Sequence, residues 1–266
     1  PVALVTGASS GFGELTAKRL AQKGYKVFGT SRKKTAAHNG VEMLVMDVQS
    51  DSSVQGGVKE LLARAQRIDL LVNNAGLAHV SALEETSPTL ARDIFETNFW
   101  GVVRVTNAVL PTLRQQRSGR IINVGSLAGL VALPGQGFYS ASKFALEGYS
   151  ESLSFEIEQF NIHVSVIEPS FFKTKLDHGM LHDDQLLPAY QTLRETIMAY
   201  FKQSVAQGED PQKVAELIVN VAENPQPNLR YRVGNDAIWT PRLKMLMPEK
   251  MFRDGTRRRF NLPSAK

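Results

Sequence analysis

Short apolar runs alternate with longer amphipathic stretches along the whole chain. Seven of these runs have the length and composition of buried β-strands, and they lie at residues 2–6, 25–30, 41–46, 70–73, 120–124, 163–167 and 230–233. The stretches between them place apolar residues at helical spacing, with long helices predicted near residues 88–114 and 140–159. Strands that alternate with helices predict an α/β fold, in which one doubly wound parallel sheet of about seven strands has helices on both faces.

The sequence shows no point at which the chain divides into separate domains. Its 266 residues contain no Gly/Ser-rich linker, internal repeat or low-complexity run, so we expect a single domain over residues 1–266. There is no cysteine, so no disulfide can form. The absence of a long apolar run and of a signal-peptide pattern leads us to expect a cytoplasmic protein.

The net charge of +5 comes from the end of the chain. Eight of the 31 Lys and Arg residues, but only two of the 26 Asp and Glu residues, lie at 241–266, so this basic C-terminal extension carries +6 and the rest of the chain −1. We therefore expect no nucleic-acid binding, which needs a basic surface over the main body. The extension interleaves apolar and basic residues, which fits packing over the protein or peripheral contact with an anionic membrane. Packing is favoured, because Pro248 interrupts any long apolar helix face.

The first predicted strand leads into a glycine-rich turn and then a helix. Gly7 allows the tight turn, Gly11 allows close backbone approach, and Gly13 allows the helix to pack on the strand. A helix N-terminus presents unpaired N–H groups and the positive end of the helix dipole, which suits a pyrophosphate. The turn therefore predicts a dinucleotide site of the Rossmann type, formed by Gly7, Ser9, Ser10, Gly11, Phe12 and Gly13.

The end of the second strand indicates which dinucleotide is bound. An acidic residue here hydrogen-bonds the ribose 2′-OH of NAD, whereas basic residues accommodate the 2′-phosphate of NADP. The chain reads Ser31-Arg32-Lys33-Lys34 and has no acid at this point. The planar fork of Arg32 can bind a phosphate, so Ser31 and Arg32 predict NADP(H); a solvated basic turn is the alternative.

Two further turns complete the predicted cofactor site. Asp47 and Val48 follow the third strand, where an adenine would lie. Asn74, Ala75 and Gly76 follow the fourth strand, where small residues leave room for a cofactor and the Asn amide can bond backbone groups. The same residues also form a good turn without any ligand.

Tyr139 and Lys143 are the most informative pair in the chain. Residues four apart share one face of a helix, so Lys143 would lie beside Tyr139. A phenol has a pKa of roughly 10, and a fixed ammonium nearby lowers that pKa by favouring the phenolate. Ser126 stands thirteen residues before Tyr139 and could hold a substrate oxygen against the phenol. These three residues predict a proton-transfer site for an alcohol or a carbonyl.

Together these motifs resemble the single-domain branch of the short-chain dehydrogenase/reductase family. The resemblance runs from Val2 to about Thr174 and rests on Thr6, Gly7, Gly11, Gly13, Asn73, Asn74, Ala75, Gly76, Asn98, Ser126, Tyr139 and Lys143. It implies an NADP(H)-dependent oxidoreductase that transfers hydride between the nicotinamide and a ketone or secondary alcohol. It also implies that Tyr139 is the general acid/base, that Lys143 holds the nicotinamide ribose, and that Ser126 steadies the developing alkoxide. Asn98 would anchor a water that links Lys143 to solvent.

The loop after the sixth strand departs from the family pattern. The family usually has Pro-Gly there, followed by a Thr that meets the carboxamide of the nicotinamide. This chain has Pro169 and Ser170, then Phe172 and Thr174. The resemblance implies that Pro169, Phe172 and Thr174 contact the cofactor, along a loop whose path Ser170 alters.

The segment at about 170–211 is expected to form a substrate lid. It is long and rich in apolar residues, and with the extension at about 241–266 it is similar to the steroid, retinoid and lipid-carbonyl reductases of the family. The resemblance therefore implies a bulky hydrophobic substrate. Four residues of the lid could be read as a metal cluster, but the family chemistry needs no metal and none is expected. They are His178, His182, Asp183 and Asp184.

Two other functions and an assembly state follow from the same residues. A catalytically silent NADP(H)-binding sensor is the alternative to an enzyme, but the complete set of Asn98, Ser126, Tyr139 and Lys143 favours catalysis. A sugar-nucleotide epimerase or dehydratase uses a similar Tyr/Lys pair but needs a larger C-terminal domain. The apolar positions of the 140–159 helix fill either the core or a helix–helix interface, and relatives imply a homodimer or homotetramer.

Overall fold

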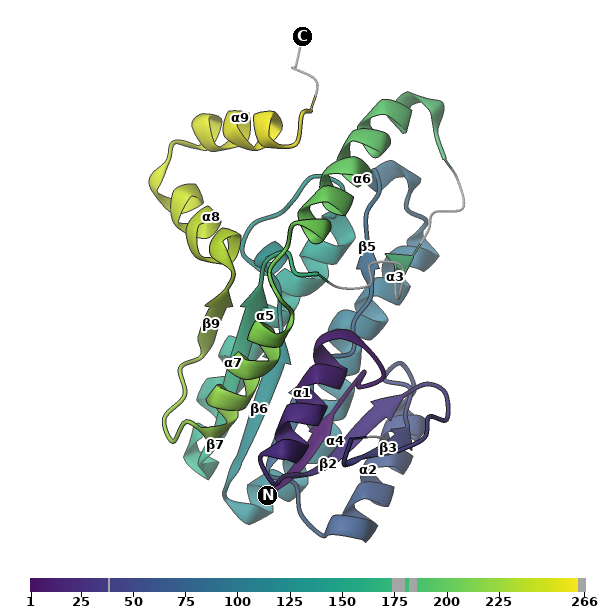
Figure 1. Ribbon diagram of the computed structural model, residues 1–266, viewed down its shortest axis with the longest axis vertical. Coiled ribbons are helices and arrows are strands. Elements are labelled where there is room, and N and C mark those ends of the chain that lie inside the picture. Colours follow the sequence, from purple (N-terminus) through teal and green to yellow (C-terminus); the bar gives the residue numbers. More distant parts are fainter. Residues whose placement is uncertain (38, 174–179, 182–185, 263–266) are drawn as a thin grey trace.

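The computed structural model shows a central parallel sheet between two layers of helices (Figure 1). It describes residues 1–37, 39–173, 180–181 and 186–262. The strands of the main sheet lie in the order β3-β2-β1-β4-β6-β7-β9 and all pair in parallel. Their bounds are β1 Val2–Val5, β2 Lys26–Ser31, β3 Val41–Val45, β4 Leu70–Asn73, β6 Gly119–Val124, β7 Ile162–Pro169 and β9 Arg230–Val233. The predicted doubly wound sheet of about seven strands is therefore confirmed.

Helices cover both faces of this sheet, and each layer buries its own apolar core. On one face lie α1 (Gly11–Gln22) and α7 (Gln212–Glu223), whose apolar sides pack on β1, β4 and β6. On the other lie α2 (Asp51–Ala65), α4 (Gly101–Gln116) and α5 (Gly137–Ile157). Because both faces of the strands are covered, the strands read as almost continuous apolar runs.

The helix predicted near 88–114 has an interruption that the sequence did not indicate. It consists of α3 (Pro88–Phe95), a π-helical segment Glu96–Trp100, and α4. The π-helical segment contains Asn98, so the interruption coincides with a predicted site residue. The helix predicted near 140–159 is α5, followed by a short 3-10 turn at Glu158–Phe160.

The order of the strands reverses direction between β1 and β4. From β1 the chain builds outward to β2 and β3, and from β4 it builds the other way to β6, β7 and β9. The loops after β1, β4, β6 and β7 therefore meet at the carboxyl edge of the sheet, where α/β proteins bind ligands.

The remaining elements lie at this same end of the molecule (Figure 1). The helix α6 (Gln191–Ala206) crosses above the sheet, and α8 (Asn235–Leu246) and α9 (Glu249–Arg259) extend from the end of β9. Two short strands, β5 (Ala78–His79) and β8 (Met180–Leu181), pair in parallel. Further 3-10 turns occupy Leu83–Glu85, Leu127–Gly129 and Pro188–Tyr190. Within the described residues, no helix has the length and apolar character needed to cross a bilayer.

Candidate active site

The glycine-rich turn joins β1 to α1 and lies directly against the loop after β4. Gly7 has φ +64°, and a Cβ at this residue would lie 2.9 Å from the Cα of Ala75. A Cβ at Gly13 would collide with the carbonyl oxygen of Gly7 and with the side-chain amide of Asn74. Only glycine fits at these two positions, because the backbones approach without side chains between them.

The first turn of α1 presents bare backbone where a pyrophosphate would bind. The side chain of its N-cap residue, Ser10, makes no capping hydrogen bond. Gly11 has φ +58°, and no other atom lies within 4 Å of the place where its Cβ would be. Ser9, Ser10 and Gly11 are exposed. Free N–H groups at a helix N-terminus bind anions, so the residues present fit a dinucleotide phosphate group.

Thr6 and Asn74 fasten the end of β1 to the end of β4. The hydroxyl of Thr6 accepts hydrogen bonds from the backbone N–H groups of Asn74 (2.9 Å) and Ala75 (3.1 Å). The side-chain amide of Asn74 donates to the carbonyls of Thr6 (3.0 Å) and Gly7 (3.1 Å). The Asn74 amide therefore shapes the glycine-rich turn, and Gly76 lies next to it in contact with Asn98.

The residues predicted to bind adenosine lie at the ends of β2 and β3, which are neighbours in the sheet. Arg32 is exposed directly after β2, and Ser31 hydrogen-bonds the hydroxyl of Thr35 at 3.0 Å. The side chain of Asp47 accepts from the N–H of Gln49 at 3.0 Å. Val48 instead faces inward, because it is only 7 % exposed and packs against α4 at Gly101.

Ser126, Tyr139 and Lys143 meet at the carboxyl end of β6. Tyr139 and Lys143 occupy the first two turns of α5, and the ammonium of Lys143 lies 5.8 Å from the centre of the Tyr139 ring. The Lys143 ammonium also donates to the carbonyl of Val124 at 2.8 Å. Ser126 follows β6 two residues later, and its side chain lies near enough to the Tyr139 phenol to lower the pKa of that phenol. The three residues predicted from the sequence are thus brought together.

Burial sets the protonation states of these two groups. It raises the pKa of the Tyr139 phenol above the usual value, and the hydrogen bond with Ser126 only partly opposes this. Burial also lowers the pKa of Lys143 to about 8, against the attraction of Glu147, which raises it. The lowering of the Tyr139 pKa by Lys143 stays a prediction, because burial and Ser126 are the influences that set this pKa here. With a pKa above the ordinary phenol value, Tyr139 carries its proton at neutral pH.

Asn98 is fully buried and ties the loop after β4 to α5. Its side-chain amide donates to the carbonyl of Leu77 (3.0 Å) and accepts from the N–H of Leu77 (2.8 Å). It also donates to the hydroxyl of Ser142 (3.2 Å), which in turn donates to the carbonyl of Tyr139 (2.7 Å). Asn98 is thus connected through Ser142 to the backbone of Tyr139, and Ser142 is a residue that the sequence analysis did not select.

The loop after β7 keeps a regular path in spite of Ser170. The N–H of Ser170 donates to the carbonyl of Val233 at 3.0 Å, which extends the β7–β9 pairing beyond Pro169. A side chain at Gly234 would collide with the Ser170 hydroxyl, so the glycine opposite makes room for the serine. Phe172 is buried edge-on against Phe12, with ring centres 5.6 Å apart.

Two sequence predictions concern residues outside the described part of the chain. They are the carboxamide contact of Thr174 and the disfavoured metal cluster of His178, His182, Asp183 and Asp184. Among the residues that the structure does describe, no group of three or more His, Cys, Asp or Glu side chains could hold a metal ion.

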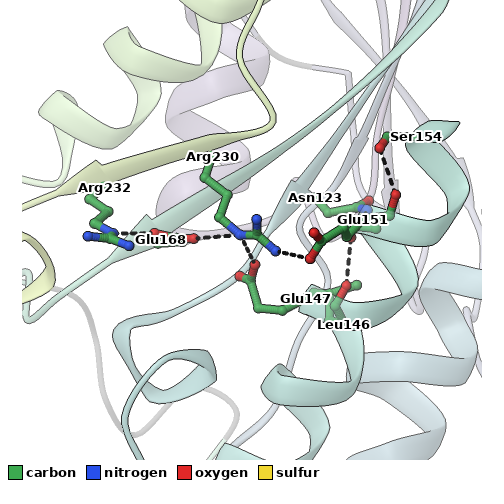
Figure 2. Close-up of polar contacts among 9 residues, drawn as sticks. Asn123, Leu146, Glu147, Glu151, Ser154, Glu168, Arg230 and Arg232 are labelled. Atoms are coloured by element: carbon green, nitrogen blue, oxygen red, sulfur yellow. Dashed lines mark hydrogen bonds and ion pairs between the residues drawn. The ribbon is translucent and has the colours of Figure 1, made fainter. Parts of the chain in front are cut away.

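A buried charge network next to Lys143 was missed by the sequence analysis (Figure 2). Arg230 lies between Glu147 on α5 and Glu168 on β7, and Arg232 binds the other side of Glu168. Glu168 is fully buried and directly precedes Pro169. The one local signal was Glu147, four residues after Lys143 on the same helix.

The lid and the C-terminal extension enclose an apolar space beside Ser126. The helix α6 packs through Ile197 and Phe201 against Phe171 and Phe260, and Phe260 of the extension is 2 % exposed. A cavity lies between these parts and the turn that follows Ser126. Its lining residues are Leu127, Val131, Leu133, Phe171, Tyr200, Asp236, Thr240, Phe252, Thr256, Arg259 and Phe260.

A family model described as short chain dehydrogenase matches residues 1–185 of the chain. The chain is 38% identical over 236 residues to a 3-ketodihydrosphingosine reductase of Bacteroides thetaiotaomicron, with 88% of this chain and 87% of that protein covered. It is 36% identical over 251 residues to retinol dehydrogenase 8 of Homo sapiens, with 87% of this chain and 80% of that protein covered.

Similar solved structures show the same fold with either nicotinamide cofactor. A short-chain dehydrogenase from Streptomyces avermitilis superimposes with a TM-score of 0.83 at 35% identity, over 97% of both chains. A serine dehydrogenase complexed with NADP+ has a TM-score of 0.74 at 27% identity, covering 88% of this chain and 94% of that one. A 3-ketoacyl-(acyl-carrier-protein) reductase from Brucella melitensis complexed with NADH has a TM-score of 0.74 at 25% identity, covering 87% and 96%.

Proposed function

The chain belongs to the short-chain dehydrogenase family, and we propose that it is an NADP(H)-dependent reductase of bulky hydrophobic ketones, or a dehydrogenase of the matching alcohols. Family membership makes it an oxidoreductase acting on CH–OH or C=O groups. The proposal adds the cofactor preference, the substrate class and the roles of the site residues. The observation that supports it best is the convergence of Ser126, Tyr139 and Lys143, whose ammonium lies 5.8 Å from the centre of the phenol ring.

The residues at the end of β6 supply the proton that carbonyl reduction needs. The nicotinamide, when bound, supplies the hydride. Tyr139 donates its phenolic proton to the carbonyl oxygen, so that hydride and proton together convert the ketone to the alcohol. Ser126 hydrogen-bonds the same oxygen and stabilises the negative charge that develops on it. Lys143 holds the nicotinamide ribose and its charge supports the phenolate that remains.

The cofactor site is built to hold both ends of a dinucleotide. Gly7, Ser9, Ser10, Gly11 and the first turn of α1 offer backbone to the pyrophosphate. Asp47 would bind the adenine end. The loop after β7, with Pro169 and Phe172, together with Thr174, would lie along the nicotinamide. The buried Val48 and Phe172 act by shaping the walls of this site.

Arg32 supports NADP(H) over NAD(H). It is exposed at the end of β2, where no acidic residue is present to bind a ribose 2′-OH. We expect Arg32→Asp to raise the KM for NADPH by roughly 10- to 100-fold, because a hydrogen bond to a charged group contributes about 1.5–3 kcal/mol. The KM for NADH should fall or stay the same. Steady-state kinetics with both cofactors would measure this.

The matched control for this experiment is Lys59→Asp, which makes the same change of charge on the exposed side of α2. It should leave both KM values unchanged, which separates a local contact from a general effect of charge. An unchanged KM for NADPH in Arg32→Asp would remove the 2′-phosphate contact from the proposal.

The cavity near the turn after Ser126 has a volume of only about 30 Å³, so the support for a hydrophobic substrate is the apolar character of the residues around it and not its size. Most of its lining is aliphatic or aromatic, and the substrates in the names of the two relatives are also hydrophobic. We expect the protein to oxidise NADPH when steroid, retinoid or long-chain ketones are added. The loss of NADPH absorbance at about 340 nm would measure this oxidation. Small polar ketones should be poor substrates. Tight NADPH binding without turnover of any carbonyl would instead favour the silent sensor.

We also propose that the protein forms a homodimer or homotetramer. The exposed apolar side chains Phe144 and Phe155 lie on α5, and Trp100 lies just before α4. Phe155 is 73 % exposed, which is unusual for a side chain of this size unless another surface covers it.

For the C-terminal extension we favour packing over membrane contact, because Phe260 is buried against the lid.

A further inference from the structure

The carboxylate residue Glu147 lies one helical turn beyond Lys143 and is as buried as the lysine. Lys143 and Glu147 are each 6 % exposed, and both lie on the side of α5 that faces the sheet. Removing a charged side chain from water costs several kcal/mol unless charged or hydrogen-bonding partners replace the solvent. Two opposite charges kept side by side in this position therefore call for an explanation.

The carboxylate of Glu147 is held from one side only. One oxygen accepts a hydrogen bond from the Nε of Arg230 at 3.0 Å. The other oxygen is buried without a hydrogen-bond partner. That oxygen lies close to Gly125, since a Cβ at Gly125 would be 3.1 Å from it. Gly125 directly precedes Ser126, so Glu147 touches the loop that presents the serine hydroxyl.

Arg230 connects this acid to two others (Figure 2). It binds Glu151 at 2.7 Å through a second nitrogen and lies 3.7 Å from Glu168, which also takes Arg232 at 3.2 Å. Glu151 is the exposed end of the network, with about half of its side chain in solvent. Glu147 is the end that lies one turn along α5 from Lys143.

We propose that Glu147, held by Arg230, is a positioning residue that keeps the Lys143 ammonium charged and fixes α5 against the Ser126 loop. This inference rests on the proposed function, because it assigns a purpose to the charge of Lys143. Glu147 touches neither of the reacting groups Ser126 and Tyr139, so it acts through its neighbours. Val124, which accepts the Lys143 hydrogen bond, offers only a neutral carbonyl, so Glu147 supplies the negative charge near the lysine.

The charged groups around Glu147 set its pKa, and this pKa determines how ionisation of Glu147 affects stability. Burial and the neighbouring Glu168 raise its pKa to about 7, while Arg230 and Lys143 oppose this. The remaining charged groups of the network are Glu151 on α5 and Arg232 on β9. Because the folded pKa lies above the ordinary carboxyl value, the ionised side chain costs stability as the pH rises toward about 7. Glu147 is therefore poorly explained as a stabilising residue at neutral pH.

The test is the pH profile of kcat/KM for carbonyl reduction. Without the carboxylate, the pKa of Lys143 should fall below its present value of about 8. In the wild type, kcat/KM should fall as the pH rises past the pKa of Lys143. In Glu147→Gln we expect this fall, the high-pH limb of the profile, to occur at a pH lower by on the order of half to one unit. Above that pH the rate relative to wild type should be roughly 3- to 10-fold lower. Arg230→Gln should move the limb the same way, because Glu147 without its arginine binds a proton more readily.

Glu151→Gln is the matched control, since it removes the exposed partner of the same arginine. Its profile should superimpose on that of the wild type. Melting temperatures at about pH 8 would show that Glu147→Gln is folded and no less stable than the wild type. Superimposable profiles of wild type, Glu147→Gln and Arg230→Gln would overturn the inference.

A measurement without turnover separates this inference from the proposed function. The ¹³Cε resonance of Lys143, assigned by its loss in Lys143→Met, reports the protonation of the lysine directly. We expect its titration midpoint to be lower in Glu147→Gln than in wild type and Glu151→Gln. An unmoved midpoint overturns the role of Glu147 even if carbonyls are reduced. A moved midpoint supports that role even if the wild type reduces none of the carbonyls tested, in which case the proposed function fails by itself.

Discussion

Tyr139→Phe should lower carbonyl reduction by two to four orders of magnitude, the range by which a positioned general acid accelerates a reaction. The variant keeps the ring and loses only the hydroxyl whose pKa the side chain of Ser126 lowers. Because loss of solvent raises the pKa of the phenol, Tyr139 is the protonated donor across the neutral range. The affinity for NADPH should stay close to wild type, which fluorescence titration of bound NADPH would measure alongside steady-state kinetics.

Tyr149→Phe provides the matched control for this experiment. Tyr149 is on the same helix, ten residues after Tyr139. Its ring makes an edge contact with the ring of Phe99. Its variant also loses one partly buried phenol hydroxyl, so any general cost to the helix appears in both proteins. Turnover by Tyr139→Phe at the rate of Tyr149→Phe would remove Tyr139 from the reaction.

Lys143→Met should damage both the rate and the binding of the cofactor. The substitution removes the charge next to the phenol and leaves the carbonyl of Val124 without its donor. Loss of a charged hydrogen-bond donor to the ribose, at about 1.5–3 kcal/mol, predicts a roughly 10- to 100-fold higher Kd for NADPH. We expect kcat to fall by about two orders of magnitude or more, because the lysine also supports proton release by Tyr139.

Lys59→Met makes the same chemical change at an exposed position of α2 and should affect neither quantity. Methionine is a good replacement in volume and removes a buried charge, so the variant should fold. If Lys143→Met lowered kcat with an unchanged Kd for NADPH, the ribose contact would be wrong. If it raised the Kd with an unchanged kcat, the catalytic part of the assignment would be wrong.

The fold was predictable because its signals are local. Strands covered on both faces appear as short apolar runs, and the helices between them keep their periodicity. The π-helical segment at Glu96–Trp100 was not predictable in this way. Asn98 is held there by Leu77 and Ser142, which are 21 and 44 residues away, so the interruption coincides with tertiary contacts.

In the site too, residues close together in the sequence were predicted, and contacts between residues far apart in the sequence were missed. Ser126 lies just after β6, and Tyr139 and Lys143 lie on α5, so the three residues are close in sequence and their spacing revealed them. Glu147 and Arg230 are 83 residues apart, and no local pattern connects them. The sequence shows the lysine near Tyr139 but does not show the loss of solvent around the phenol, which raises its pKa.

The position of β9 has a consequence for how the protein behaves in concentrated solution. It is the last strand of the main sheet, paired with β7 on one side. Backbone groups along the outer side of such a strand can pair with another molecule and start aggregation, and charged residues on the strand discourage this. Arg230 and Arg232 supply that charge on a strand of four residues. Variants of the chain that neutralise these arginines should thus be more prone to self-association.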